Sequence, residues 1–161
     1  DYELWPVITQ YILIILMFIG GCAGSTGGGM KVARILLIFK HAHVQLFRLI
    51  HPRAIRLVKL GNIPVDREVM QAILGFFALF MGVFVFASFL MAASGMDLVS
   101  AGAAVIATLS NIGPGLGSVG PTDNYAHIAP FGKSVLMFCM LLGRLELFTV
   151  LVLIFPTFWR K

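Results

Sequence analysis

The stretch from Ser110 to Pro121 contains four glycines and two prolines among twelve residues, a composition that disfavours a regular helix. Glycine has no side chain, so it lets backbone carbonyls turn toward an ion where a side chain would obstruct them. Rings of such carbonyls can replace the hydration shell of a cation. The composition is therefore typical of an ion filter built from backbone oxygens, and also of an external loop made of ordinary turn residues.

A short apolar segment of small residues, Leu98 to Leu109, precedes this glycine-rich stretch. It is too short to cross a bilayer, which takes about 20 residues, and it has the length of a re-entrant segment. Backbone that is not helical is tolerated at membrane depth only when it is buried in protein or lines a wet cavity. Because the negative end of the short helix would face that cavity and favour a cation, the pair of segments favours the filter.

A second run of glycines, from Gly20 to Gly29, interrupts an apolar stretch that extends from Pro6 to Leu37. Each glycine costs about 1 kcal/mol in a helix relative to alanine, so the run is predicted to open the helix into a loop near mid-membrane. Such a loop is suited to a flexible gate or to a substrate site made of unwound backbone. Close helix packing is the alternative, but it usually places glycines at every fourth residue.

Two ionisable residues, Arg144 and Glu146, lie about halfway along the apolar stretch from Pro130 to Phe155. Ionisable groups at this depth are costly and indicate a cavity or a buried partner. Side chains two residues apart point in different directions on a helix, which predicts a separate partner for each. Arg144 would raise an electrostatic barrier in a cation path or hold the glycine loop. A structural salt bridge inside the helix bundle is the alternative.

Motifs of soluble enzymes do not account for these residues. The segment around Ser25 lacks the first glycine of a nucleophile elbow, and Met30 stands where a P-loop needs lysine. Gly115 to Gly120 fits G-x-G-x-x-G but has no strand–helix–strand context. The cysteines and histidines do not form a recognisable catalytic or metal-ligating set. We therefore expect no enzyme activity and no cofactor held by this chain.

Composition indicates a membrane protein. Of 161 residues, 59% are hydrophobic and 12% are charged, and the mean hydropathy is +0.95; soluble domains are about 45–50% apolar and about 25% charged. Eight of the twelve lysines and arginines lie between Lys31 and Arg67, which the positive-inside rule places in the cytoplasm. The cytoplasmic placement of these basic residues accounts for the net charge of +5, so nucleic acid is not an expected partner. The stretch from Ala42 to Val58 has apolar residues at helical spacing among basic ones, which predicts an amphipathic helix at the membrane surface or against a cytosolic partner.

Three motifs of the chain resemble the TrkH family, the membrane subunits of bacterial Trk potassium-uptake systems in the Trk/Ktr/HKT superfamily. Gly20 to Lys31 resembles the interrupted inner helix of the family's third repeat, and Ser110 to Gly115 resembles the filter of its fourth repeat. Gly143 to Leu147 resembles the arginine-bearing segment of the last helix. The resemblance covers essentially the whole chain and implies the C-terminal portion of such a subunit, which cannot close a pore alone.

The implied fold is an all-α membrane protein with one potassium-channel-like repeat, preceded by a broken inner helix of the previous repeat. Such a repeat consists of a helix, a re-entrant pore helix with a filter loop, and a second helix. The implied units are the inner helix of the third repeat at 1–40 with an intramembrane loop at 20–29, a basic cytoplasmic connection at 41–68, and the fourth repeat at 69–161. Within the fourth repeat we expect an outer helix at 69–96, a pore helix at 98–109, a filter at 110–115 and an inner helix at 130–159.

The resemblance also implies the site residues. Asn111, Ile112 and Gly113 would supply one quarter of the filter and bind potassium, the substrate, through their backbone. The intramembrane loop would block the path below the filter, and Arg144 would restrain this loop or the ion. The implied gate residues are Gly20, Gly21, Gly24, Ser25, Thr26, Gly27, Gly28, Gly29 and Lys31.

The implied function is potassium uptake across the bacterial inner membrane by a multi-pass protein whose C-terminus is cytoplasmic. The alternatives are a non-conducting membrane assembly module and a sodium-permeable or cation-coupled transporter of the same superfamily. The implied partners are the first, second and third repeats of the same transporter, a second protomer in a homodimer, the lipid bilayer, and a cytosolic nucleotide-binding regulatory ring of the TrkA type.

Overall fold

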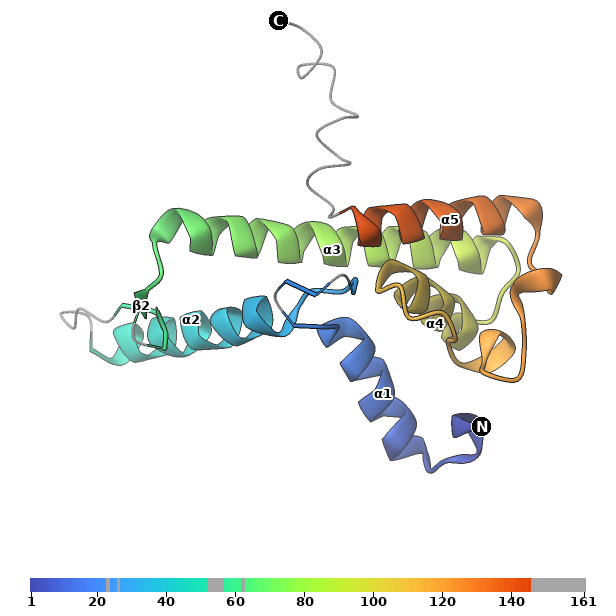
Figure 1. Ribbon diagram of the computed structural model, residues 1–161, viewed down its shortest axis with the longest axis horizontal. Coiled ribbons are helices and arrows are strands. Elements are labelled where there is room, and N and C mark those ends of the chain that lie inside the picture. Colours follow the sequence, from blue (N-terminus) through green and yellow to red (C-terminus); the bar gives the residue numbers. More distant parts are fainter. Residues whose placement is uncertain (23, 26, 52–56, 62, 146–161) are drawn as a thin grey trace, which may run out of the picture.

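The computed structural model describes residues 1–22, 24–25, 27–51, 57–61 and 63–145. Its helices and strands are α1 (Val7–Ile19), α2 (Val32–Ile50), β1 (Lys59–Leu60), β2 (Ile63–Pro64), α3 (Arg67–Ala93), α4 (Leu98–Leu109) and α5 (Pro130–Arg144). Short 3₁₀ turns are η1 (Tyr2–Leu4), η2 (Gly117–Val119) and η3 (Tyr125–His127). α3 and α5 lie side by side and run in opposite directions, and α4 packs against both (Figure 1).

Among the described residues, α3 is the one helix that is long and apolar enough to cross a bilayer, with a mean hydropathy of 2.5 over its best window. It ends where Gly95 adopts a φ of +94°. The N–H groups of Gly95 and Met96 then donate to the carbonyls of Ala92 and Met91, which closes the last turn. The observed helix, Arg67–Ala93, is therefore shifted toward the N-terminus relative to the predicted 69–96.

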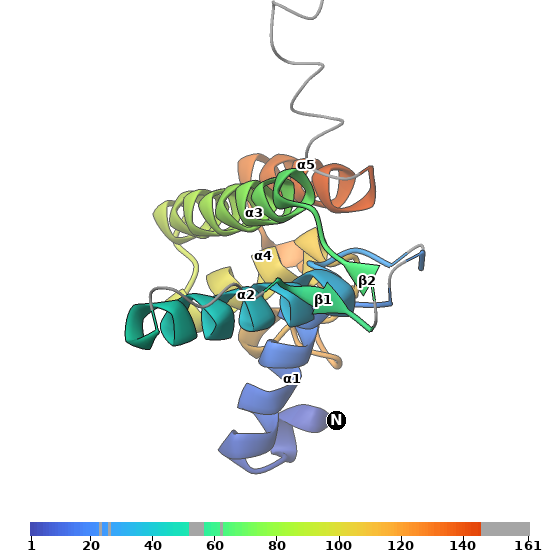
Figure 2. The same ribbon diagram turned by 90° about the vertical axis from the view of Figure 1, so that its left-hand side faces the viewer.

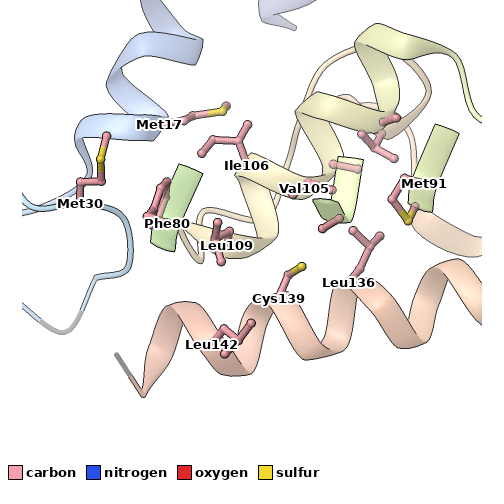
Figure 3. Packing of buried hydrophobic residues seen from close by; sticks show 14 of the residues in the cluster. Met17, Met30, Phe80, Met91, Val105, Ile106, Leu109, Leu136, Cys139 and Leu142 are labelled. Atoms are coloured by element: carbon pink, nitrogen blue, oxygen red, sulfur yellow. The ribbon is translucent and has the colours of Figure 1, made fainter. Parts of the chain in front are cut away.

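α4 is a buried helix of 12 residues, with the same bounds as predicted from the sequence. It is about 18 Å long at 1.5 Å per residue, which is shorter than the hydrocarbon core of a bilayer. The Asp97 carboxylate caps it by accepting the Val99 N–H at 3.2 Å. Figure 3 shows Leu136 and Cys139 of α5 pointing toward α4, and these residues belong to one buried apolar cluster with Val105 and Leu109.

The first apolar stretch forms two helices with a loop between them. The chain leaves α1 at Gly20, with a φ of +68°, and enters α2 after Lys31, with a φ of +66°. The Met30 N–H donates to the Phe18 carbonyl at 3.2 Å, and the Val32 N–H donates to the Gly21 carbonyl at 3.1 Å. These bonds hold the two ends of the loop together, and α1 and α2 leave it in different directions (Figure 1).

The basic connection begins as helix, and α2 crosses the predicted boundary at residue 40 without a break. α2 continues to Ile50 because no glycine or proline occurs between Val32 and Ile50, and it covers the first half of the amphipathic helix predicted at 42–58, of which residues 52–56 lie outside the described part of the chain. β1 and β2 then form an antiparallel hairpin beside α2 (Figure 2), a small departure from an all-α chain. The Lys40 ammonium group donates to the Lys59 carbonyl at 3.0 Å and ties the hairpin to α2.

Candidate functional site

The predicted filter begins where α4 ends. The N–H groups of Asn111 and Ile112 donate to the carbonyls of Thr108 and Ala107 at 3.0 and 2.8 Å. Asn111 has a left-handed φ of +54°, a conformation that asparagine tolerates better than most residues. This cap satisfies two carbonyls of the last helical turn and directs the chain out of the helix at once.

The backbone oxygens of this loop have different environments. Within the described part of the chain, no donor reaches the carbonyl oxygens of Asn111 and Ile112, which leaves them available to a cation. Gly113 has a φ of +106°, and a Cβ added there would meet nothing within 4 Å. Backbone conformation, rather than lack of space, therefore requires glycine at position 113.

Two tyrosine hydroxyl groups reach the outer end of the same loop. The Tyr125 hydroxyl donates to the Gly113 carbonyl at 2.6 Å, and the Tyr2 hydroxyl donates to the Gly115 carbonyl at 2.7 Å. Burial, with a smaller contribution from Tyr2, raises the pKa of the Tyr125 hydroxyl above its ordinary value, which favours the protonated form that donates. The sequence alone does not identify either tyrosine, because a single tyrosine in a polar turn carries no pattern.

The glycine loop lies directly against the end of α4. A Cβ at Gly28 would come within 2.7 Å of both the carbonyl carbon and the oxygen of Ser110. A Cβ at Gly20 would come within 2.5 Å of the Gly28 oxygen. Because backbone atoms occupy these positions, glycine is needed where the loop folds back on itself and where it meets the base of the predicted filter.

Gly29 is also buried and tightly packed, since a Cβ there would lie 3.0 Å from the Gly20 Cα, whereas Gly24 and Ser25 are exposed. The Ser25 hydroxyl accepts the Gly27 N–H at 3.1 Å. A Cβ at Gly24 would meet nothing within 4 Å. Lys31 holds a left-handed φ, which is strained for a long side chain and places local strain at the end of the loop. Thr26 lies outside the described residues.

A cavity of about 200 Å³ separates the glycine loop from α3 and α5. Three basic residues from different segments line it: Lys31, Arg34 and Arg144. The Arg34 guanidinium lies 4.2 Å from the centre of the Phe76 ring, a cation–π contact. Arg144 therefore shares this cavity with the loop, as its predicted role requires, while its sequence neighbour Glu146 lies outside the described residues.

Gly143 lets α5 approach the base of the predicted filter. A Cβ at this position would overlap the Leu109 carbonyl oxygen and lie 2.8 Å from Nδ2 of Asn111. Nδ2 of Asn111 donates to the Met140 carbonyl at 3.4 Å, which adds a long hydrogen bond between α5 and the loop. A lone glycine in an apolar helix is the sequence signal for such close approach, but it does not identify the opposing segment.

Known proteins resemble this chain over its whole length. Residues 1–161 match the TrkH family model, which is described as a cation transport protein. The chain is 50% identical over 157 residues to the Trk system potassium uptake protein TrkH of Salmonella typhimurium, and 49% identical over 157 residues to that of Escherichia coli K12. Each alignment covers 98% of this chain and 32% of the relative.

A solved structure is similar to this chain in fold as well as in sequence. The crystal structure of the potassium transporter TrkH from Vibrio parahaemolyticus superposes with a TM-score of 0.88 and 48% sequence identity. The superposition covers 97% of this chain and 33% of that one. The chain thus spans about a third of the length of the curated relatives that it matches.

Proposed function

Because the chain belongs to the TrkH family of cation transport proteins, we propose that it supplies one filter quarter and the gating loop of a potassium-uptake pore in the bacterial inner membrane. The observation that carries this proposal is the pair of carbonyl oxygens at Asn111 and Ile112, which no donor reaches within the described residues. They follow the C-terminal end of α4, whose dipole favours a cation. Carbonyls in this setting suit an ion that has shed its water.

The other three quarters of the filter belong to the rest of the same transporter, in its first, second and third repeats. A second protomer and a cytosolic nucleotide-binding ring of the TrkA type complete the assembly. The basic segment between Lys31 and Arg67 faces the cytoplasm in this arrangement, where the ring would act. Potassium is the substrate and not a resident cofactor.

The glycine loop and Arg144 control passage below the filter. An ion that leaves the carbonyls meets the loop at Gly28, which packs against the Ser110 backbone. It then meets the cavity lined by Lys31, Arg34 and Arg144, where positive charges raise the energy of a cation. Conduction therefore requires the loop to move, and its glycines give the backbone the conformational freedom to do so.

Substitution of Gly113 by alanine tests the proposed filter. We expect the potassium-to-sodium flux ratio of the complete transporter in liposomes to fall about tenfold, because a residue strained by about 1–2 kcal/mol displaces the filter backbone. Gly95→Ala is the matched control, since Gly95 has a φ of +94° and its Cβ would also meet nothing within 4 Å. An unchanged ratio in Gly113→Ala would favour a non-conducting assembly module.

Substitution of Arg144 by alanine tests the electrostatic barrier. One unit charge about 8 Å from an ion contributes about 2 kcal/mol at an effective dielectric constant of 20. We therefore expect potassium flux through the complete transporter to rise about 30-fold. Arg67→Ala, which removes a basic side chain at the exposed start of α3, is the control and should leave flux unchanged. Equal flux in the two variants would remove Arg144 from the barrier.

A further inference from the structure

We propose that Tyr125 and Tyr2 form a tyrosine brace, a pair of hydroxyl groups that fixes the outer carbonyls of the filter loop and thereby maintains its ion selectivity. This inference rests on the proposed filter function of the loop. The two hydroxyls act on alternate residues of the loop, Gly113 and Gly115, at 2.6 and 2.7 Å. Tyr125 follows its acceptor by 12 residues in the sequence, and Tyr2 precedes its acceptor by 113 residues.

Each tyrosine is itself held by a capped turn. Tyr125 lies in η3, where the Asn124 side chain accepts the Ala126 N–H at 2.9 Å. The Ile128 N–H donates to the Tyr125 carbonyl, and Ile128 is buried in the main apolar cluster. Tyr2 lies in η1, where the Asp1 carboxylate accepts the Glu3 N–H at 3.0 Å. Hydrogen bonds within these turns therefore hold the backbone from which each hydroxyl reaches the loop.

The loop needs such support at Gly113. This residue has a positive φ and no side chain, and even an added Cβ would touch nothing within 4 Å, so Gly113 has no side-chain contact of its own that fixes its backbone. Pro114 follows with no N–H to donate. The Gly113 N–H makes a long hydrogen bond to the Ala107 carbonyl at 3.4 Å, and the next backbone restraint is the Gly115 N–H, which donates to the Val119 carbonyl at 2.8 Å. Between the cap of α4 and that bond, the Tyr125 hydroxyl is what fixes the direction of the Gly113 carbonyl.

The role assigned to Tyr125 is positioning, and ion binding remains with the backbone. The Gly113 oxygen accepts a hydrogen bond from the Tyr125 hydroxyl through one lone pair. This bond restrains the orientation of the carbonyl relative to the ion path. A selective filter requires its carbonyls to stay in place as ions of different size pass. Loss of the hydroxyl frees the carbonyl to reorient, which weakens discrimination more than it weakens folding.

Tyr125→Phe in the complete transporter tests the brace, because phenylalanine keeps the ring and removes only the donor. We expect the potassium-to-sodium flux ratio in liposomes to fall about fivefold, the factor that one ordinary hydrogen bond supplies. The Tyr2→Phe, Tyr125→Phe double variant should lower the ratio further. Tyr11→Phe is the matched control, since Tyr11 is an exposed residue of α1, and should keep the ratio of the parent protein.

The flux ratio does not depend on how much protein is reconstituted, so lower yield alone does not imitate the expected result. A ratio in Tyr125→Phe equal to that of Tyr11→Phe would overturn the brace. If Gly113→Ala lowers the ratio while Tyr125→Phe does not, the brace fails and the filter stands. If neither variant changes the ratio, the proposed filter fails as well. Should Tyr125→Phe not yield folded protein, Tyr2→Phe carries the same test at Gly115.

Discussion

Gly143→Ala is expected to destabilise the complete transporter by about 3 kcal/mol, at the upper end of what overpacking usually costs. The added Cβ would overlap the Leu109 carbonyl oxygen and lie within 2.8 Å of the Leu109 carbonyl carbon. Both atoms belong to the last turn of a buried helix and have no rotamer through which to yield. α5 must therefore move away from the base of the filter. Thermal loss of the monodisperse species in detergent measures the effect.

Gly82→Ala is the matched control for this prediction. Gly82 also lies inside an apolar helix, α3, but a Cβ there would meet nothing within 4 Å. Alanine should therefore be neutral or stabilise the helix by up to about 1 kcal/mol. If Gly143→Ala and Gly82→Ala had the same thermal stability, the close approach of α5 to Leu109 would not exist in the assembled protein.

Gly28→Ala is expected to raise potassium flux about tenfold. Its Cβ would come within 2.7 Å of the Ser110 backbone and 3.0 Å of the Asn111 side chain, so the loop is pushed away from the base of the filter. Overpacking of this kind costs about 1–3 kcal/mol in the blocked state. Each 1.4 kcal/mol changes the ratio of open to blocked molecules about tenfold. Potassium efflux from loaded liposomes measures the change.

Gly27→Ala separates this effect from a general loss of glycine in the loop. A Cβ at Gly27 would meet only the Ser25 hydroxyl, at an ordinary contact distance of 3.4 Å, so flux should stay close to that of the parent protein. Equal flux in Gly27→Ala and Gly28→Ala would show that contact with Ser110 does not hold the blocked state. Reduced flux in Gly28→Ala alone would contradict a blocking role for the loop.

Local signals predict much of this fold. The bounds of α4 follow from the Asp97 cap and from the polar and glycine residues after Leu109, which act within a few positions. The glycine runs likewise predict two segments of irregular backbone. The end of α2 at Ile50 is not predicted, because basic residues indicate which side of a membrane a segment faces and say little about where a helix ends.

Only part of the site can be predicted from the sequence, and the reason is physical. A backbone carbonyl oxygen and the conformational freedom of glycine are properties of a single residue. Asn111, Ile112 and Gly113 can therefore be proposed from sequence and resemblance. The contacts that position these residues join distant segments. The bond from Tyr2 to Gly115 spans 113 residues, and no periodicity or motif encodes that pairing. The same holds for the approach of Gly143 to Leu109.

Anomalous scattering from rubidium in crystals of the complete transporter tests the central claim most directly, because it locates the ion rather than its flux. We predict a rubidium peak in contact with the backbone oxygens of Asn111 and Ile112, at the end of α4. The peak should weaken or move in Gly113→Ala and remain in Gly95→Ala. Rubidium peaks elsewhere along the pore, with none at Asn111 and Ile112, would contradict the assignment of this loop as a filter.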